Sequence, residues 1–261
     1  LSSKGSRMVI SYFCLLKGMI KIEPWRLAIL LLLLNSFPSV SQAYIIADHN
    51  SVAQFDQIPD YWINKVKEDR MLVHYVGESH SRQMPHGLQL LEDMDSKYSV
   101  QISHDLNVLA ELNALRLLNG TYNTQYSSWS FGAGDQDYWS TPGGIGYTED
   151  SIHQAISQNE RTNISIWAWC WDICKDGFFS QANEFTDTHL QWYLDAIAGF
   201  NDNENINQTT FVYHTSVTDG TRQDNDWDVT RFNDQIRQVA IANNGILFDQ
   251  ADIENLSLIH I

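Results

Sequence analysis

Apolar runs and amphipathic stretches alternate along most of this chain. Branched and aromatic residues concentrate in runs that suit buried parallel strands, at residues 71–76, 98–102, 164–169, 209–213 and 246–248. Apolar residues at helical spacing predict helices over residues 60–69, before Met94, and over residues 106–118, 151–158, 186–200 and 229–242. Alternating strands and helices indicate a parallel sheet, and right-handed crossovers place helices on both of its faces. We therefore expect an α/β protein, a three-layer α/β/α sandwich around a doubly wound sheet.

Residues 121–148 interrupt this alternation and predict a long connection between elements. The segment is polar but rich in Tyr, Trp and Phe, and it ends in the run Pro142-Gly143-Gly144-Ile145-Gly146-Tyr147. Long loops inside compact domains are often functional, and a high aromatic content favours an ordered loop. Aromatic platforms suit sugar rings, although a small apolar cluster beneath the loop is the alternative.

The two ends of the chain have their own signals. Basic residues after Met19, the apolar stretch 27–34 and the small residues before Tyr44 predict a secretory signal peptide within a leader at residues 1–43. The domain would then span residues 44–255. Residues 256–261 match one translated frame of a transposase sequencing adapter, or form a short apolar strand. The adapter interpretation predicts a domain truncated at its C-terminus and a natural chain that continues differently after Asn255.

The charge of the chain argues against two classes of anionic partner, nucleic acids and anionic membranes. Its formal net charge is −16 at pH 7. Removing the leader takes away five basic residues and one acidic residue, which leaves 11 basic against 31 acidic. Phosphate backbones and anionic membranes attract Lys and Arg, so we expect no nucleic-acid partner and no membrane binding after signal cleavage. Cys170 and Cys174 can pair, bind metal or stay free in an exported chain.

The candidate chemistry begins where the first strong strand ends. The run 71–76 stops at Gly77 and leads into Ser79, at the edge of an open sheet where ligands bind. One interpretation is a nucleophile turn that presents the Ser79 hydroxyl. The other is that Gly77 permits a tight turn and Ser79 caps the next helix. His214 and Asp249 follow later strands and are expected at the same edge.

An ordered series of short segments resembles a group of exported bacterial proteins of the SGNH (GDSL-like) hydrolase superfamily. The series includes Ile58-Pro59 with Trp62-Ile63, the strand into Ser79-His80 followed by Gln83, Gly144-Ile145-Gly146-Tyr147, Ile166-Trp167-Ala168-Trp169-Cys170, Tyr193-Leu194, Phe211-Val212-Tyr213 and Asn243-Asn244-Gly245-Ile246-Leu247-Phe248-Asp249-Gln250-Ala251-Asp252-Ile253-Glu254. Within it, Gly77-Glu78-Ser79 is similar to the Gly-Asp-Ser turn of the superfamily. The resemblance covers essentially all of residues 44–255. It implies a flavodoxin-like fold, hydrolysis of carboxylic esters without a cofactor, and Ser79 as the nucleophile.

The resemblance also implies the partners of that nucleophile. An oxyanion hole would use the Ser79 amide and the amide of Gly144, while Trp171 stands where the superfamily has an asparagine. The superfamily histidine comes from beyond the last strand, which here falls after Asn255. Within the chain, His214 is the best-placed candidate base, with Asp219 near it in sequence. Arg82 and Gln83 either contact substrate or solvate the turn.

Three functions follow as hypotheses. The leading one is an exported serine esterase, secreted or periplasmic, that acts on a small-molecule or polysaccharide ester through a Ser79 acyl-enzyme. The alternative is a non-catalytic carbohydrate-binding or surface protein on a degenerate SGNH fold. A metal hydrolase built on Asp172, His214 and Asp249 is a further alternative, although no compact metal-ligand motif supports it and we expect no metal.

Overall fold

Parallel strands form the central sheet of the part of the chain that the structure describes. The computed structural model describes residues 44–77, 79–109, 113–131, 142–169, 187–203, 206, 208–216 and 229–259. Within them, seven strands lie in the order β1-β9-β8-β7-β2-β4-β3, and every neighbouring pair is parallel. These strands are β1 (Ile45–Ala47), β2 (Leu72–Gly77), β3 (Val100–Ser103), β4 (Leu115–Leu118), β7 (Thr162–Ala168), β8 (Thr210–His214) and β9 (Ile246–Phe248).

The strand order confirms the predicted fold class. Numbered as they occur along the chain, β2, β4, β7, β8 and β9 have the spatial order 2-1-3-4-5 of a flavodoxin-like sheet, and β3 and β1 extend its two edges. The chain winds in one direction from β2 to β4 and in the other from β7 onward. The point where the winding reverses lies between β2 and β7, and ligands of such sheets bind at the carboxyl ends of strands at this point.

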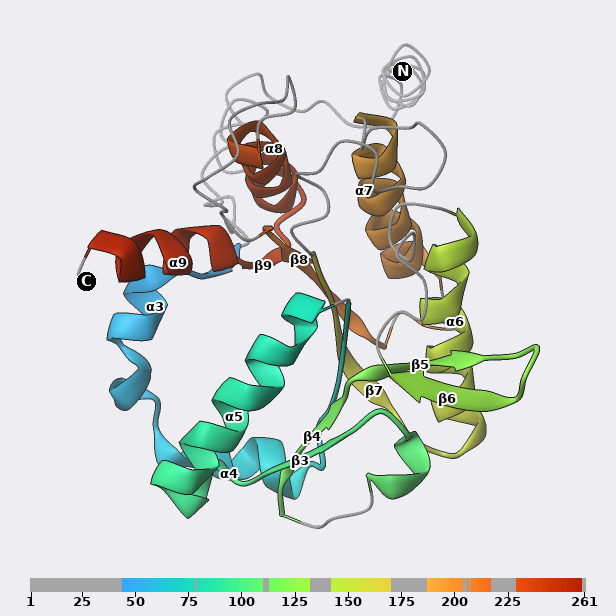
Figure 1. Cartoon of the computed structure of the whole chain (residues 1–261), viewed down its shortest axis with the longest axis horizontal. Coiled ribbons are helices and arrows are strands. Elements are labelled where there is room, and N and C mark those ends of the chain that lie inside the picture. Colours follow the sequence, from blue (N-terminus) through green and yellow to red (C-terminus); the bar gives the residue numbers. More distant parts are fainter. Residues whose placement is uncertain are drawn as a thin grey trace, which may run out of the picture. The chain divides into compact units, whose positions relative to one another are not determined.

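Helices cover both faces of the sheet. Helix α5 lies on one side, and α6, α7 and α8 lie on the other (Figure 1). Among the described residues, no helix is both long and apolar enough to cross a membrane. The α-helices are α3 (His49–Ala53), α4 (Asp60–Glu68), α5 (Gln83–Met94), α6 (Pro142–Ser157), α7 (Asp187–Asp202), α8 (Val229–Ala242) and α9 (Gln250–Ile259), and the 3-10 helices are η2 (Phe55–Gln57), η3 (Ser79–Arg82), η4 (Ser96–Tyr98) and η5 (Leu106–Val108).

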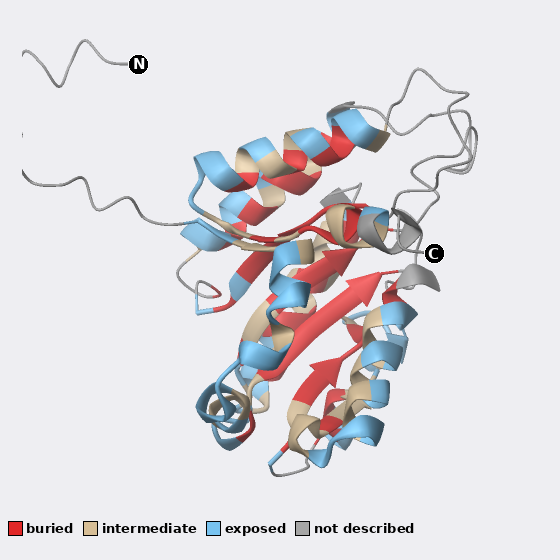
Figure 2. Cartoon of the chain, turned by 90° about the vertical axis from the view of Figure 1, so that its left-hand side faces the viewer, coloured by how far each residue is buried: buried red, intermediate tan, exposed pale blue. Residues whose placement is uncertain are grey.

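Side chains of β2 point alternately to the two faces of the sheet and pack into two apolar clusters, one on each face. Val73 and Tyr75 belong to the apolar cluster that also includes side chains of α5, whereas Val76 joins the larger cluster beneath α6, α7 and α8. All six residues of β2 are buried, and Figure 2 shows the central strands buried between helices that expose their outer surfaces. A strand covered on both faces reads as a continuous apolar run, which is why this one was predictable.

The predicted helix over residues 106–118 is wrong. Only Leu106–Val108 is helical among the described residues of that segment, as the 3-10 turn η5, and Leu115–Leu118 is the strand β4. Its leucines recur every three residues, a spacing that the helical pattern allows but does not require. Leu117 pairs with Val73 of β2 on one side and with Ile102 of β3 on the other, so ladder hydrogen bonds override the local propensity.

The long connection predicted over residues 121–148 is also wrong in part. It contains an antiparallel hairpin of β5 (Gly120–Asn123) and β6 (Ser128–Phe131), and its glycine-rich end is the beginning of α6. The predicted helix over residues 151–158 is the second half of α6. Strand β1 and helix α9 were not predicted, and α9 replaces the alternative of a strand over residues 256–261.

Candidate functional site

The turn that follows β2 is held by buried hydrogen bonds. Ser81 donates its hydroxyl to the carbonyl oxygen of Gly77 at 3.0 Å, which closes the 3-10 turn η3 against the end of the strand. Asn119, the first residue after β4, donates its Nδ2 to the carbonyl oxygen of Ser81 at 3.1 Å. Ser81 and Asn119 are both buried. The neighbouring strand therefore fixes the backbone on which Ser79 lies.

Close approach of two backbones explains the glycine at the end of β2. A Cβ atom on Gly77 would lie 2.4 Å from the carbonyl oxygen of Ala168 and 2.9 Å from its Cβ. Gly77 and Ala168 are also register partners at the ends of β2 and β7. Only glycine allows these strands to end side by side, at the position where the winding of the sheet reverses.

The structure places the predicted residues of the turn on η3 and α5. Ser79 is the first residue of η3, and its side chain lies outside the described residues. The Arg82 guanidinium lies over the Phe131 ring at 4.8 Å, so the β5–β6 hairpin borders the turn. Gln83 accepts a hydrogen bond at its Oε1 from Gln250 Nε2, across 3.0 Å. This contact joins the start of α5 to the start of α9.

Of the predicted oxyanion donors Gly144 and Trp171, only Gly144 lies among the described residues. Gly144 is buried in the first turn of α6, so it belongs to a helix rather than to a loop. Trp171 lies outside the described residues, as do Asp172, Cys170, Cys174 and Asp219. The second strand of the flavodoxin-like order is β4, and Asn119 and Gly120 follow it. Because residues 106–118 were predicted as a helix, the sequence did not point to these two residues as the ones after that strand.

His214 is buried at the end of β8. The side chain is fully buried, its ring lies 5.2 Å from Phe248 and 6.3 Å from Tyr75, and neither ring nitrogen has a hydrogen-bond partner among the described residues. Burial lowers its pKa to about 4, against smaller opposing effects of the nearby Thr215 backbone and of the Asp249 charge. The backbone N–H of His214 donates to the Tyr193 hydroxyl.

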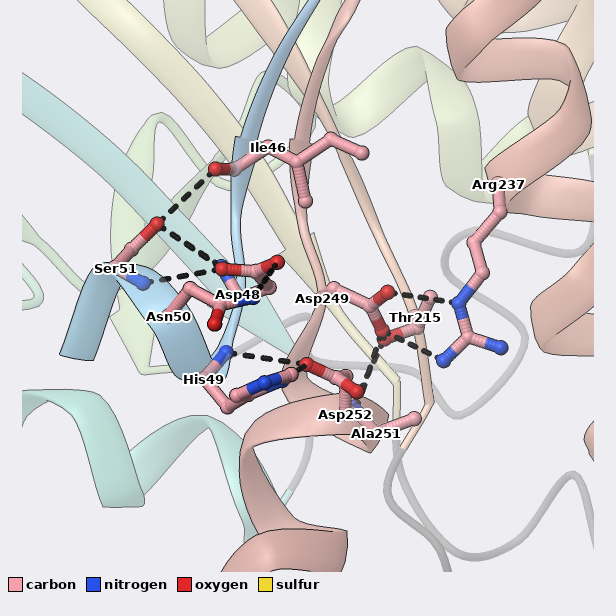
Figure 3. Close-up of polar contacts among 10 residues, drawn as sticks. All are labelled: Ile46, Asp48, His49, Asn50, Ser51, Thr215, Arg237, Asp249, Ala251 and Asp252. Atoms are coloured by element: carbon pink, nitrogen blue, oxygen red, sulfur yellow. Dashed lines mark hydrogen bonds and ion pairs between the residues drawn. The ribbon is translucent and has the colours of Figure 1, made fainter. Parts of the chain in front are cut away.

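Asp249 stabilises the end of β9 and the start of α9. Arg237 donates Nε and Nη2 to its two carboxylate oxygens at 2.7 and 2.8 Å, and Thr215 donates its hydroxyl at 3.0 Å (Figure 3). Both carboxylate oxygens therefore already accept hydrogen bonds from protein donors. It offers little to the metal site proposed from Asp172, His214 and Asp249.

A histidine and a carboxylate that the sequence did not single out meet at the same edge. His49 follows β1, Asp252 lies in the first turn of α9, and the His49 Nδ1 contacts Asp252 Oδ2 in a short hydrogen bond (Figure 3). The backbone N–H of His49 donates to the same oxygen at 3.1 Å. The hydrogen bond to Asp252 raises the His49 pKa, although desolvation lowers it to a smaller extent.

Asp48 brings a second carboxylate to this pair. One ligand atom each from Asp48, His49 and Asp252 lies within 4.8 Å of the others. However, Asp48 caps helix α3: its Oδ1 accepts from the backbone and hydroxyl of Ser51, and its Oδ2 accepts from Asn50. Since His49 Nδ1 already faces Asp252, the arrangement is a hydrogen-bonded pair beside a capped helix rather than a coordination shell.

Comparisons with protein-family models, with curated proteins and with solved structures find no match to this chain. The predicted relation to the SGNH hydrolases therefore remains a prediction.

Proposed function

We propose that this protein is an exported serine esterase that hydrolyses carboxylic esters through an acyl-enzyme on Ser79. The observation that carries the proposal is the position of Ser79, on the turn after β2 at the reversal point of a flavodoxin-like sheet. Gly77, the Ser81 hydroxyl and the Asn119 amide restrain this turn at three places. A restrained strand–turn–helix is what a nucleophilic serine needs, because its hydroxyl must be held against an ester carbonyl.

The surroundings of the turn favour an ester carried on a carbohydrate. Phe131 on the hairpin is 42% exposed beside Arg82, and Tyr126 at the hairpin loop is 71% exposed. Exposed aromatic rings stack on the apolar faces of sugars, and a guanidinium can donate to their hydroxyls. The proposed substrates are therefore acyl esters of polysaccharides or oligosaccharides.

Hydrolysis of p-nitrophenyl acetate and of acetylated xylan tests this proposal. We expect the protein to release acetate and to react covalently with a fluorophosphonate, and Ser79→Ala to abolish both. Ser96→Ala is the matched control, because Ser96 is exposed on η4. Wild-type protein without hydrolysis or labelling, or Ser79→Ala with unchanged activity, would refute the esterase.

A non-catalytic carbohydrate-binding protein is the second candidate, favoured by the same exposed rings of Tyr126 and Phe131. It predicts that acetylated xylan binds without release of acetate. Binding that Phe131→Ala weakens and Ser79→Ala leaves intact, in a protein that does not hydrolyse the ester, would favour this candidate over the esterase.

A further inference from the structure

His49 and Asp252 follow neighbouring parallel strands at one edge of the sheet. Ala47 and Phe248 are register partners at the ends of β1 and β9, and the chain continues from them to His49 and to Asp252. All strands of the sheet run parallel, so this is the same carboxyl edge at which β2 ends in Gly77. The pair therefore lies on the side of the sheet where ligands of this fold bind.

The backbone holds both members of the pair in position. Asp252 donates its N–H to Asp249 Oδ1 at 3.3 Å in the first turn of α9, and Asp249 is itself held by Arg237. His49 is held to Asp252 by its backbone N–H as well as by its ring. Two contacts from one residue to one carboxylate oxygen define the orientation of the imidazole, as an orienting carboxylate does in nucleophilic enzymes.

This orientation determines which ring nitrogen can accept a proton. When Nδ1–H donates to the Asp252 carboxylate, Nε2 carries the lone pair. Among the described residues, Nε2 has no hydrogen-bond partner, and 37% of the side chain is exposed. His214 differs on both counts, because it is fully buried and no described carboxylate contacts its ring. Of these two histidines, only His49 combines an orienting carboxylate with an accessible nitrogen.

A direct contact joins the start of α9, the helix that carries Asp252, to the start of α5 beside the Ser79 turn. Gln250, two residues before Asp252, donates Nε2 to Gln83, four residues after Ser79, and also to Glu254 in α9. Glu254 is in turn close enough to Tyr75 of β2 to contribute to its raised pKa, which burial chiefly causes. The start of α9 therefore lies against the end of β2 and the start of α5, although β1 and β2 are separated by three strands in the sheet.

We propose that His49, oriented by Asp252, is the general base of the reaction at Ser79. This inference rests on the proposed esterase function. His49 Nε2 takes the proton of the Ser79 hydroxyl while Oγ forms a bond to the ester carbonyl carbon. The tetrahedral intermediate then breaks its bond to the alcohol oxygen, which receives the proton from Nε2. Water, deprotonated by the same nitrogen, hydrolyses the acyl-enzyme and restores the Ser79 hydroxyl. Asp252 is a positioning residue that holds the tautomer.

Substitutions at the pair, made in the whole protein, test the proposal. We expect His49→Ala to lower kcat for p-nitrophenyl acetate by roughly 10²- to 10⁴-fold, and added imidazole to restore part of the rate. Asp252→Asn should shift the acid limb of the kcat/KM profile to lower pH, because it removes the hydrogen bond that raises the His49 pKa. Asp252 and Asp48 are the charged groups that act on His49, so Asp48→Asn shows how much the second carboxylate contributes. His86→Gln, exposed on α5, is the matched control.

The outcomes separate this inference from the proposed function. If wild-type activity requires Ser79 but His49→Ala, folded by circular dichroism, keeps full activity and an unchanged pH profile, the base assignment fails and the esterase stands. If the wild type neither hydrolyses esters nor reacts with a fluorophosphonate, the esterase and the role of His49 fail together. Activity that EDTA abolishes and added metal restores would also overturn the assignment, in favour of a metal held by Asp48, His49 and Asp252.

Discussion

Asn119 donates its side-chain Nδ2 to the backbone carbonyl of Ser81, so a residue at the end of β4 holds the turn that follows β2. Both residues are buried, and the contact spans 38 residues of sequence. The turn that carries Ser79 is thus restrained by the neighbouring strand as well as by its own residues.

Removal of this contact should loosen the turn. We expect Asn119→Ala to destabilise the fold by roughly 1–3 kcal/mol, because it leaves the buried Ser81 carbonyl without this donor. Fluorophosphonate labelling of Ser79 should slow in parallel. Urea unfolding and labelling kinetics measure the two effects, with Asn201→Ala on the exposed end of α7 as the control. An unchanged midpoint for Asn119→Ala would show that the hydrogen bond contributes little.

Two glycine substitutions should have opposite effects. We expect Gly77→Ala to destabilise by roughly 1–3 kcal/mol, because its methyl group would overlap the Ala168 carbonyl and force β2 and β7 apart. Gly87 in α5 has no atom within 4 Å of an added Cβ, so Gly87→Ala should stabilise by roughly 0.5–1 kcal/mol through helix propensity. Thermal unfolding compares both with the wild type. Equal unfolding temperatures for Gly77→Ala and Gly87→Ala would contradict the close approach of β2 and β7.

Buried histidines should make the fold sensitive to acid. Burial lowers the pKa values of His74 and His214 from 6.5 to about 4. Between these values the unfolded chain binds more protons than the folded one, so stability present above pH 6.5 is lost as the pH falls towards 4. Each histidine corresponds to roughly 3 kcal/mol if the full shift is realised.

His214→Phe tests this acid sensitivity. The ring lies between Tyr75 and Phe248 and has no described partner for its nitrogens, so phenylalanine should fit and flatten the loss of stability between pH 6.5 and 4. Urea unfolding at pH 7, 5.5 and 4.5 measures the slope. His153→Phe, at an exposed position of α6, should leave the slope unchanged. An equal slope for His214→Phe and wild type would refute the role of His214.

The ion pair between Arg237 and Asp249 should contribute more to the free energy of unfolding than the exposed pair between Arg237 and Asp234. Arg237→Met leaves the buried Asp249 carboxylate without two donors, and we expect a loss of roughly 2 kcal/mol. The loss should be smaller than for a fully buried pair, because 28% of the Arg237 side chain is exposed. Asp234→Ala removes only the exposed partner of the same guanidinium and should change stability by less than about 1 kcal/mol. Chemical unfolding compares the two variants, and equal losses would contradict this ranking.

The local pattern of apolar and polar residues was sufficient to predict many of the strands and helices. Residues 71–76 were predictable as a strand, because a strand buried on both faces must be apolar along its length, and residues 246–248 form a shorter apolar run that is buried at Leu247. Helix α8 was predictable because Phe232, Ile236 and Val239 recur at helical spacing, and all three belong to the core or pack against it. The alternation of such elements was enough to predict the doubly wound sheet.

The same reasoning failed where long-range pairing decided the structure. Leu115–Leu118 forms a strand because β2 and β3 lie on either side of it, and leucine spacing carries no signal of those neighbours. Strand β1 has only three residues and forms through pairing with β9, about 200 residues away. Neither the strand nor the site that depends on it has a local signature.

For the candidate site, sequence alone determined the turn. An apolar run that ends in Gly77 before Ser79 indicates a strand and the polar turn after it, because a strand and a tight turn are encoded by residues within a few positions. Only the tertiary structure decided what surrounds that turn. It buried His214 away from solvent, and it joined His49 to Asp252 across 203 residues. The physical reason is that parallel strands distant in sequence end at one edge of the sheet, and side chains meet there according to strand order and register.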